Sequence, residues 1–487
     1  MNQKRSYKTY NKNDNRRSHP RGARPSRSYG SSDKFSSVLG HLHTPRVLMI
    51  ASTLVLIVLG LLMVFSASSI TSIAESGSAF TVVTKQLPYA ILGTLLCIAI
   101  VLFIPYKEWT RVIGYAFAAL CALGLVATAV AGTAALGAQR WLVLGPVSLQ
   151  PSEFAKIAFI LIGSKIFDQY QMGEIDSRTL IYKAVGFLLI PLGFLYITQS
   201  DLGTTGIICV GLLAVLWLGE ASQKIILRII GVMALFALLS VVFTSYRSSR
   251  MAFLNPWDDA SGAGYQLIHS FFAFSEGGIF GAGLGNSHEK FQYLPEAQTD
   301  FVFSILGEEL GLVVTTLVVI LFLVFLYAGL KIAHDAPDGF GRMIAGSLTT
   351  MIVFQAFLNM ACVLGLAPTT GKPLPFLSAG GSSMLSSLMM VGIILSVSYG
   401  SHKPEPKRPT NYNKRRDNLR VVRRVSDSEV ERKKVGQRDF PKAPRSRFES
   451  ARIMQTQNRS RKKNPNENRH ENKRASYYDR RPPIRRK

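Results

Sequence analysis

Ten long apolar runs dominate this chain between residues 48 and 399. An α-helix of about 20 apolar residues spans the hydrocarbon core of a bilayer, and runs of about 17 to 25 residues are read as such helices. The runs lie near 48–67, 88–105, 113–132, 153–167, 182–198, 203–219, 225–245, 301–329, 343–364 and 380–399. The sequence therefore predicts an all-α polytopic membrane protein with about ten transmembrane helices.

The basic residues of the chain gather in its two ends. Residues 1–46 contain 11 Lys and Arg against 2 Asp and Glu, and residues 401–487 contain 29 against 10. Both ends are poor in aliphatic residues, so neither can bury enough apolar surface to offset its chain entropy. We expect two disordered basic tails around a membrane domain of residues 47–400. We expect no cleavable signal peptide, because the first apolar run is full length and follows a long polar tail.

Charge also predicts the orientation of the chain. Basic segments beside membrane helices stay in the cytoplasm, and an even number of spans places both tails there, in a multi-pass protein of the cell membrane. The short loops on the same side carry Lys107, Arg111, Arg178, Lys224, Lys331 and Arg342. The simplest interpretation of the tails is a solvated chain held against an anionic inner leaflet. They contain no base-reading motif, so we expect no nucleic-acid partner.

With this orientation, the chemically unusual segments all face the outside. They are residues 139–141, 150–156, 199–201, the long loop 246–300 between helices 7 and 8, and 369–383. Irregular backbone at membrane depth is tolerated only where it is buried in protein or lines a wet cavity. Loops as long as 246–300 are usually functional or disordered, and the many aromatic residues of this loop argue against disorder. The sequence thus predicts one composite extracytoplasmic site.

Three carboxylates stand at the start of the eighth run. Asp300 lies where the long loop enters the helix, so it is either a helix cap or a functional group. Glu308 and Glu309 follow within the apolar run. An acid at the centre of a membrane helix costs roughly 2.5 to 3.5 kcal/mol. We therefore expect Glu308 and Glu309 to face the bundle interior and to be paired.

A second charged group opens the fourth run. Glu153 and Lys156 are three residues apart, and hence neighbours on one helical face. They form either an internal ion pair that braces the helix or part of a substrate site. Arg140 stands beside Trp141, where the two side chains can clamp a phosphate or lie at the membrane interface.

The cysteines, two of the histidines and a glycine-rich stretch show no spacing typical of a disulfide framework, a metal site or a nucleotide site. The four cysteines, Cys97, Cys121, Cys209 and Cys362, fall within apolar runs and are interpreted as small buried residues. His269 and His288 lack a partner at metal-ligand spacing. The glycine-rich stretch 281–285 lies in an exterior loop without a βαβ context, so it is no dinucleotide-binding turn.

Several motifs of the membrane domain resemble those of a known family. They are RW…GP…QPSEFAK (140–156), QSDLGT (199–204), FLNPW to GEELG (253–311), and PTTGKPLPFLSAGGSS (368–383). Over roughly residues 45–400 the chain resembles the SEDS proteins (shape, elongation, division and sporulation). The stretch from Gly283 to Phe301 is more similar to the division members than to the elongation members. The chain departs from the family pattern at Ser200, Gln298 and Ala379, where Pro, His and Tyr are usual.

The resemblance implies a peptidoglycan glycosyltransferase that polymerises lipid II, an undecaprenyl-pyrophosphate-linked disaccharide, outside the membrane during cell division. It also implies that Asp300 is essential. Displacing a lipid pyrophosphate needs one base for the acceptor hydroxyl and cations for the leaving group, so Asp300 is the expected catalytic base. The residues expected to bind substrate are Arg140, Glu153, Lys156, Lys290, Glu296, Lys372, Ser382 and Ser383. These residues imply no certain cofactor, and a divalent cation (Mg²⁺ or Mn²⁺) is an open alternative.

Two rival functions fit the same architecture. Ten helices with charged residues also suit a lipid II flippase, although a flippase needs polar groups near the midplane, whereas these cluster on one side. A non-catalytic division scaffold leaves the outer residues unexplained. The expected partners are lipid II, a class B penicillin-binding protein (a transpeptidase), the division machinery and the membrane.

Overall fold

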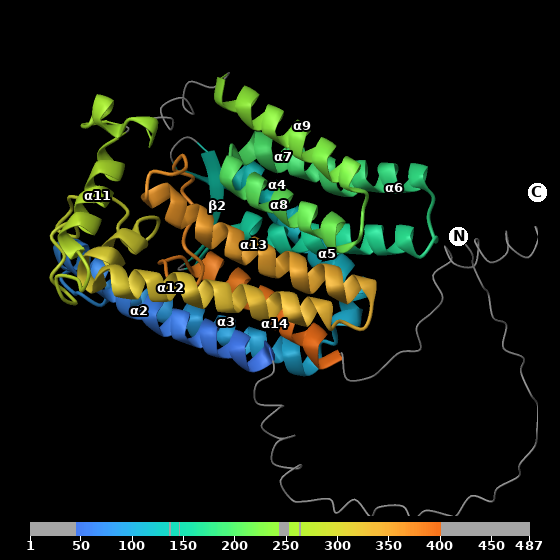
Figure 1. Cartoon of the computed structure of the whole chain (residues 1–487), viewed down its shortest axis with the longest axis horizontal. Helices are drawn as coiled ribbons and strands as arrows, with labels where there is room; N and C mark the ends of the chain where they lie inside the picture. Colours follow the sequence, from blue (N-terminus) through green and yellow to red (C-terminus); the bar gives the residue numbers. More distant parts are fainter. Residues whose placement is uncertain (1–44, 136–137, 146, 243–252, 263, 401–487) are drawn as a thin grey trace, which may run out of the picture. The chain divides into compact units, whose positions relative to one another are not determined.

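The computed structural model of the chain describes residues 45–135, 138–145, 147–242, 253–262 and 264–400 (Figure 1). The predicted tails, except for residues 45 and 46, and the first residues of the loop 246–300 lie outside this part. Within it, each apolar run becomes a helix or a pair of stacked helices, because a chain surrounded by lipid satisfies its backbone N–H and C=O groups only within such elements. The predicted all-α class is therefore confirmed.

The helices follow one another with short connections. Their bounds are α2 (Pro45–Ser76), α3 (Thr81–Phe103), α4 (Val112–Ala131), α5 (Pro151–Gln171), α6 (Ser177–Ala184), α7 (Ile190–Gln199), α8 (Leu202–Leu218), α9 (Gln223–Val242), α11 (Tyr265–Gly277), α12 (Val302–His334), α13 (Gly339–Val363) and α14 (Gly381–Gly400). A 3₁₀ turn, η1 (Tyr106–Thr110), precedes α4, and another, η4 (Pro256–Asp259), precedes α11. A π-helical turn, η2 (Val185–Leu189), joins α6 to α7.

Length and composition qualify seven helical segments of the described residues as membrane spans. They are α2, α3, α4, the continuous segment from α6 to α7, α12, α13 and α14. Helix α8 is apolar but shorter, with 17 residues. Helix α5 contains Glu153, Lys156, Lys165 and Asp168, which lower its mean hydropathy. The chain is thus a multi-pass membrane protein, and the count of ten spans stays a prediction.

A small antiparallel sheet interrupts the helices between α4 and α5. Its strands are β1 (Thr133–Ala135), β2 (Ala138–Leu144) and β3 (Val147–Leu149), in the order β1-β2-β3. In the register, Thr133 pairs with Trp141 and Leu142 with Leu149. Residues 139–141, expected from the sequence to lie in an outer segment, belong to strand β2 of this sheet. The sheet matters for function because its central strand carries Arg140.

The long loop also differs from the expectation of an irregular segment. Helix α11 occupies Tyr265–Gly277 and packs against α12. Helix α12 is broken at Gly311, whose φ of 72° is in the left-handed region. The loop fills the break: Ala282 and Gly283 donate their N–H groups to the carbonyls of Glu308 and Glu309 at 2.8 and 3.0 Å. The break in α12 thus fixes the path of the loop that leads to Asp300.

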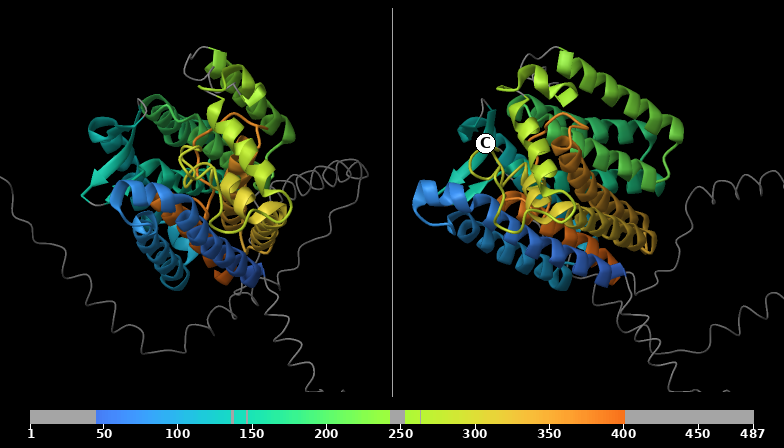
Figure 2. Two further views of the ribbon diagram at one scale, coloured as in Figure 1. Left: turned by 90° about the vertical axis from the view of Figure 1, so that its left-hand side faces the viewer. Right: turned by 60° about the vertical axis from the view of Figure 1, so that its left-hand side comes forward.

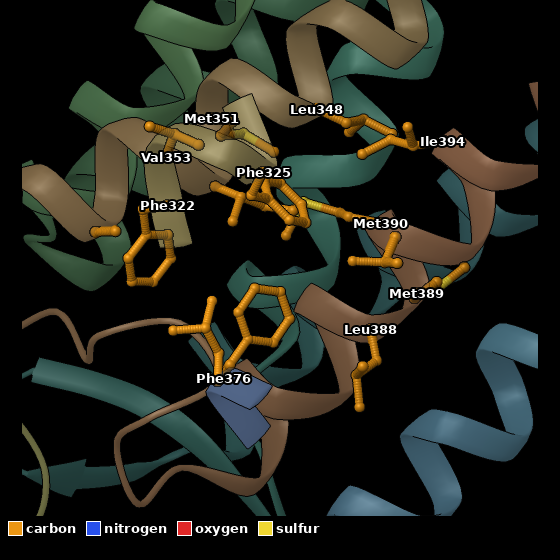
Figure 3. Packing of buried hydrophobic residues seen from close by; sticks show 14 of the residues in the cluster. Phe322, Phe325, Leu348, Met351, Val353, Phe376, Leu388, Met389, Met390 and Ile394 are labelled. Atoms are coloured by element: carbon orange, nitrogen blue, oxygen red, sulfur yellow. The ribbon is translucent and has the colours of Figure 1, made fainter. Parts of the chain in front are cut away.

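The buried core of the bundle lies around α12, α13 and α14. Phe322 and Phe325 of α12 pack with residues of α13, α14 and the segment before α14 (Figure 3). The ring of Phe376 from that segment is 6.0 Å from the ring of Phe325. On the other side, a Cβ added at Gly60 of α2 would lie 2.2 Å from the Phe376 carbonyl oxygen. The segment 364–380 is therefore clamped between helices.

The polar segments gather at one end of the helices, which we call the site end. Strand β2, helix α11 and the connection from α13 to α14 all lie there (Figures 1 and 2). Hydrogen bonds between them agree: Gln150 N donates to Ser382 Oγ at 3.0 Å, and Ala379 N donates to the Gln298 carbonyl at 2.8 Å. The predicted gathering of these segments is confirmed for the described residues.

The orientation of this end is open to a direct test. We expect cysteines placed in the described part of the long loop, such as Trp257→Cys, to react with a membrane-impermeant maleimide from outside. Cysteines placed in either tail should react only after the inner face is opened. The measurement uses a variant without the four native cysteines. Labelling of Trp257→Cys from the cytoplasm alone would reverse the topology and remove the extracytoplasmic site.

Candidate active site

Asp300 is held at the centre of the site end by a residue of α13. The Asn359 side-chain amide donates to two carbonyl oxygens, those of Asp300 and Lys372, each at 2.8 Å. The Asp300 carboxylate lies beside Gly371, where an added Cβ would be 3.5 Å from Asp300 Oδ2. The N-cap of α12 is Phe301, one residue beyond Asp300. Asp300 is half-buried, so its carboxylate can reach both the protein and a substrate.

Lys372 follows Gly371 and forms a buried ion pair. Its ammonium group is 2.5 Å from Asp201 Oδ2, and the two side chains are 4% and 2% exposed. Asp201 also caps α8, because its carboxylate accepts from the backbone N–H and the hydroxyl of Thr204 at 2.9 and 2.8 Å. Burial opposes ionisation of Asp201, but the Lys372 cation and these hydrogen bonds outweigh it and hold the pKa of Asp201 at about 2.

The expected pair of Glu153 and Lys156 forms at the start of α5. Lys156 Nζ is 2.8 Å from Glu153 Oε2, and both side chains are 1% exposed. Lys156 also donates to Gln355 Oε1 at 2.8 Å, and Gln355 Nε2 donates to the Pro373 carbonyl at 2.9 Å. Gln355 and Asn359 are one turn apart on α13. Together they fix residues 372 and 373 and so join both ion pairs to the site of Asp300.

Arg140 supplies a cation without an acidic partner among the described residues. Its Nε donates to the Gln199 carbonyl at 2.9 Å, and one terminal nitrogen donates to the Ser200 carbonyl at 3.3 Å. Two of the five N–H groups of a guanidinium are thus used, and its positive charge contributes to the lowered pKa of Asp201. The turn beside it adopts φ of 46° at Ser200. Proline cannot take this angle, so the departure from the family's usual Pro fits the local backbone.

Lys290 lies in a second polar cluster, which anchors the long loop. Its ammonium group is 3.1 Å from Glu309 Oε1 and also donates to the Gly285 carbonyl. Ser66 of α2 donates to both oxygens of Glu309 at 2.6 and 2.7 Å. Lys290 thus has the contacts of a structural residue that ties the loop to α2 and α12.

Glu308 holds the neighbouring part of the loop. Its carboxylate accepts from Ser287 Oγ at 2.6 Å and from the backbone N–H groups of His288 and Glu289. Both Glu308 and Glu309 are fully buried. The expectation that these two acids face the interior is confirmed. Glu309 is paired with Lys290, whereas Glu308 is hydrogen-bonded but has no ion pair among the described residues.

The remaining expected substrate residues have different surroundings. Glu296 is exposed, and its carboxylate accepts from Thr299 Oγ1 at 2.7 Å. Ser382 accepts from the backbone of Gln150 and thereby joins α14 to the start of α5. Ser383 is buried, and its hydroxyl has no hydrogen-bond partner among the described residues. Of these three, Ser383 has the free polar atom that a bound water or substrate could use.

Several further buried polar atoms at this end lack a partner within the described part of the chain. They are the oxygen and nitrogen of the Gln199 amide, Asn359 Oδ1, Glu153 Oε1 and Ser152 Oγ. Buried polar groups without hydrogen bonds are costly and usually satisfied by water or ligand. The site end is therefore built to hold polar molecules.

Comparison with known proteins agrees with this geometry. The family model of the FtsW, RodA and SpoVE cell cycle proteins matches residues 46–403. The chain belongs to this family. The matched range agrees with the resemblance to the SEDS proteins over roughly residues 45–400 of this chain.

Relatives in this family cover most of the membrane domain. Stage V sporulation protein E of Bacillus subtilis is 37% identical over 359 residues, which is 73% of this chain and 97% of the relative. Probable peptidoglycan glycosyltransferase FtsW of Geobacter metallireducens is 39% identical over 343 residues, 70% of this chain and 90% of the relative. The FtsW relative agrees with the similarity to division-type members.

Solved structures share the fold of this family member. The rod shape determining protein RodA of Thermus thermophilus aligns with a TM-score of 0.55 and 24% identity, over 73% of this chain and 97% of RodA. A chain from a peptidoglycan synthase complex, studied for its coordination of polymerization and crosslinking, aligns with a TM-score of 0.59 and 24% identity, over 73% and 98%. At this identity the likeness shows the fold.

Sequence reasoning missed two residues that organise this family member's site, Gln355 and Asn359. The sequence did contain a signal for them. Burying the polar side chains of a Gln and an Asn within the apolar run 343–364 costs free energy unless both are hydrogen-bonded. Asp201 stood in a segment noted as unusual but was not expected to bind Lys372. Asp201 and Lys372 are 171 residues apart in the sequence, so only the folded structure shows that they form a pair.

Proposed function

We propose that this chain is a peptidoglycan glycosyltransferase that polymerises lipid II into glycan strands on the outer face of the cytoplasmic membrane during cell division. The main observation in support is the half-buried Asp300 carboxylate, held beside Gly371 and Lys372. Arg140 is linked to the same group, because it binds the Ser200 carbonyl next to Asp201, the partner of Lys372. Relatives that carry the name peptidoglycan glycosyltransferase support the proposed activity.

The chemistry asks for a base and for positive charge. The acceptor hydroxyl attacks the donor sugar at C1, the bond from C1 to the pyrophosphate oxygen breaks, and the configuration inverts. Asp300 accepts the hydroxyl proton, and the lipid pyrophosphate leaves with the bonding electron pair. Base catalysis contributes about 10² to 10⁴ in rate, and preorganised cations stabilise the departing charge.

The cations at the site end differ in how available they are. Lys156 and Lys372 are each paired with a buried carboxylate at 2.8 and 2.5 Å. Arg140 donates only to backbone carbonyls in its described contacts, and it forms no ion pair of its own with an acid among the described residues. Arg140 is therefore the cation best suited to bind the pyrophosphate. The ion pairs of Lys156 and Lys372 determine the shape of the site and the electrostatic potential around Arg140.

A divalent cation is compatible with these residues. Mg²⁺ is usually held by one or two carboxylates together with substrate phosphates. No three His, Cys, Asp or Glu side chains of the described part gather closely enough to hold a metal ion by themselves. Asp300 is the carboxylate that would contact such an ion, which would neutralise pyrophosphate charge when bound.

The proposed partner is a class B penicillin-binding protein, and the proposed setting is the division machinery. A solved chain of the same fold comes from a peptidoglycan synthase complex, which supports an assembly of this kind. With the site end outside, both termini lie in the cytoplasm.

The deciding experiment is polymerisation of lipid II by the purified full-length protein, with and without a class B penicillin-binding protein, with glycan strands resolved on gels. Strand formation that depends on the chain supports the proposal. A flippase predicts instead that fluorescent lipid II crosses vesicle membranes while no strands form. A scaffold predicts that strands depend on the partner alone and do not change when Asp300 is replaced.

Arg140→Gln should lower the catalytic efficiency on lipid II by about tenfold to a hundredfold, the amount expected for a lost charge-assisted hydrogen bond. Arg140→Lys should recover only part of this, because an ammonium cannot bind pyrophosphate with two parallel bonds. The matched control is Arg111→Gln. Arg111 is exposed and pairs with Glu108 at 2.8 Å in the connection between α3 and α4. Wild-type efficiency of Arg140→Gln would remove Arg140 from the site.

A further inference from the structure

A long apolar groove runs beside α5, from Ala155, next to Lys156, toward the end of the bundle opposite the site end. It has a volume of about 450 Å³ and is lined by residues of η1, α4, α5 and the segment from α6 to α7. Along α5 the lining extends from Ala155 to Gln169, roughly 21 Å at about 1.5 Å per residue. Half of a bilayer's hydrocarbon core is about 15 Å thick. The groove is long enough for a lipid acyl chain.

The groove is apolar along most of its length and open to the lipid. Small residues of α4, including Ala118 and Ala122, line the groove and leave room for a ligand. Tyr115 and Phe187, which stand on opposite elements of the lining, are each 58% exposed. The wall after α6 contains a π-helical turn, η2, ahead of Pro191, whose missing N–H interrupts the regular ladder.

Positive charge collects at the end of the groove far from Asp300. Lys165 and Lys183 both line it. Lys165 donates to the Thr110 carbonyl and lies 4.1 Å from the centre of the Tyr115 ring, and Lys183 donates to Gln169 Oε1 at 2.9 Å. Neither lysine forms an ion pair with an acid among the described residues, so both ammonium groups can bind an anionic group.

The acids near this end form no ion pair with either lysine among the described residues. Glu108 pairs with Arg111, and Asp176 caps α6 by accepting from Thr179 N at 3.1 Å. Asp168 faces α13, since a Cβ at Gly339 would lie 2.9 Å from its Oδ1. Glu174 lies in the exposed turn between α5 and α6. The groove end therefore presents two cations and no neutralising carboxylate.

A buried donor points to the same kind of ligand. Trp109 lines the groove and is 4% exposed, and its indole N–H has no acceptor among the described residues. Its ring packs edge-on against Phe117 with centroids 5.8 Å apart. An unsatisfied buried N–H costs roughly 1 to 3 kcal/mol. A phosphate or ester oxygen of a bound lipid would supply the missing acceptor.

We propose that this groove binds one anionic glycerophospholipid, whose phosphate contacts Lys165 and Lys183 and whose acyl chain lies along α4 and α5. In the proposed orientation this lipid belongs to the inner leaflet, where anionic headgroups attract basic residues beside membrane helices. The site is separate from the polymerisation site, and its ligand is a bilayer lipid rather than the substrate.

The test is a lipid titration of the full-length protein in neutral detergent, followed by native mass spectrometry. Phosphatidylglycerol and phosphatidylcholine with identical acyl chains are compared. Wild-type protein should bind phosphatidylglycerol about 30-fold more tightly, since each cation near the headgroup contributes roughly fivefold. Lys165→Gln with Lys183→Gln should abolish this preference by weakening phosphatidylglycerol binding much more than phosphatidylcholine binding. Lys165→Arg with Lys183→Arg should keep it.

Two further variants separate the groove from the surface charge. Ala122→Phe fills the groove from an exposed position and should weaken the binding of both lipids at least tenfold. Lys331→Gln, which removes an exposed lysine paired with Asp335 at 3.3 Å, is the charge control and should change nothing. If the double glutamine variant fails to fold, Lys183→Gln alone should still reduce the preference about fivefold.

Several results would overturn the proposal. One is a phosphatidylglycerol preference that survives in the folded glutamine variants. Another is undiminished lipid binding by Ala122→Phe, which would leave only nonspecific attraction to surface charge. A third is undecaprenyl phosphate displacing phosphatidylglycerol at equal concentration, which would assign the groove to the carrier chain. Asp300→Asn should bind phosphatidylglycerol like the wild type, so this test does not depend on the proposed activity.

Discussion

Asp300→Asn should yield a folded, membrane-inserted protein that makes no detectable glycan strands from lipid II. The substitution keeps the volume and the hydrogen-bonding capacity of the side chain but removes the proton acceptor. Loss of a catalytic base lowers the rate by about 10² to 10⁴. The measurement is strand formation by purified protein, with thermal melting in detergent as the check of folding.

A capping role for Asp300 makes a different prediction. Asn caps helices about as well as Asp, so a capping residue would lose about a kcal/mol of stability or less and no activity. The N-cap position of α12 is Phe301, which argues against capping as the main role. Strand synthesis by Asp300→Asn at the wild-type rate would end the assignment of this residue as the base.

The matched control is an acid in the same loop with a local partner. Glu276 is exposed and lies 3.0 Å from the exposed His288. Glu276→Gln should therefore polymerise lipid II at a rate close to that of the wild type. A similar loss in both variants would point to general damage to the loop.

The second large effect concerns stability. Lys156→Met should lower the free energy of unfolding by about 3 to 5 kcal/mol, because it leaves the Glu153 carboxylate buried without its cation. The loss should appear as a lower melting temperature and a lower yield of folded protein in the membrane. Lys331→Met is the control, since an exposed ion pair such as that of Lys331 and Asp335 contributes about 0.5 kcal/mol or less.

The double variant Glu153→Gln with Lys156→Met separates bracing from substrate binding. Removing both charges should restore much of the stability, because no buried charge then stays unpaired. We expect this folded double variant to polymerise lipid II more slowly than the wild type, since Glu153 Oε1 is buried without a described partner in the site. Normal polymerisation would leave the pair a purely structural role, and a double variant as unstable as Lys156→Met would contradict the buried ion-pair explanation.

The sequence by itself determined the class of fold and the region of the site. Long apolar runs leave helices as the favoured solution in lipid, so the elements followed from composition and length. The cost of burying Glu308 and Glu309 predicted that both would be paired. Glu309 does pair with Lys290, and Glu308 is satisfied by hydrogen bonds such as that from Ser287. Motif spacing was sufficient to indicate the family.

Only the tertiary structure decided which charges meet. Lys290 and Lys372 both stand in polar outer segments, yet one pairs with Glu309 and the other with Asp201. These partners depend on how helices distant in sequence pack, and local patterns carry no information about that packing. The same holds for the sheet around Arg140 and for helix α11, whose short elements are stabilised by contacts beyond their own residues. The length of an apolar run is a local property and was enough to predict the helices, whereas the pairing of buried charges is set by the complete bundle.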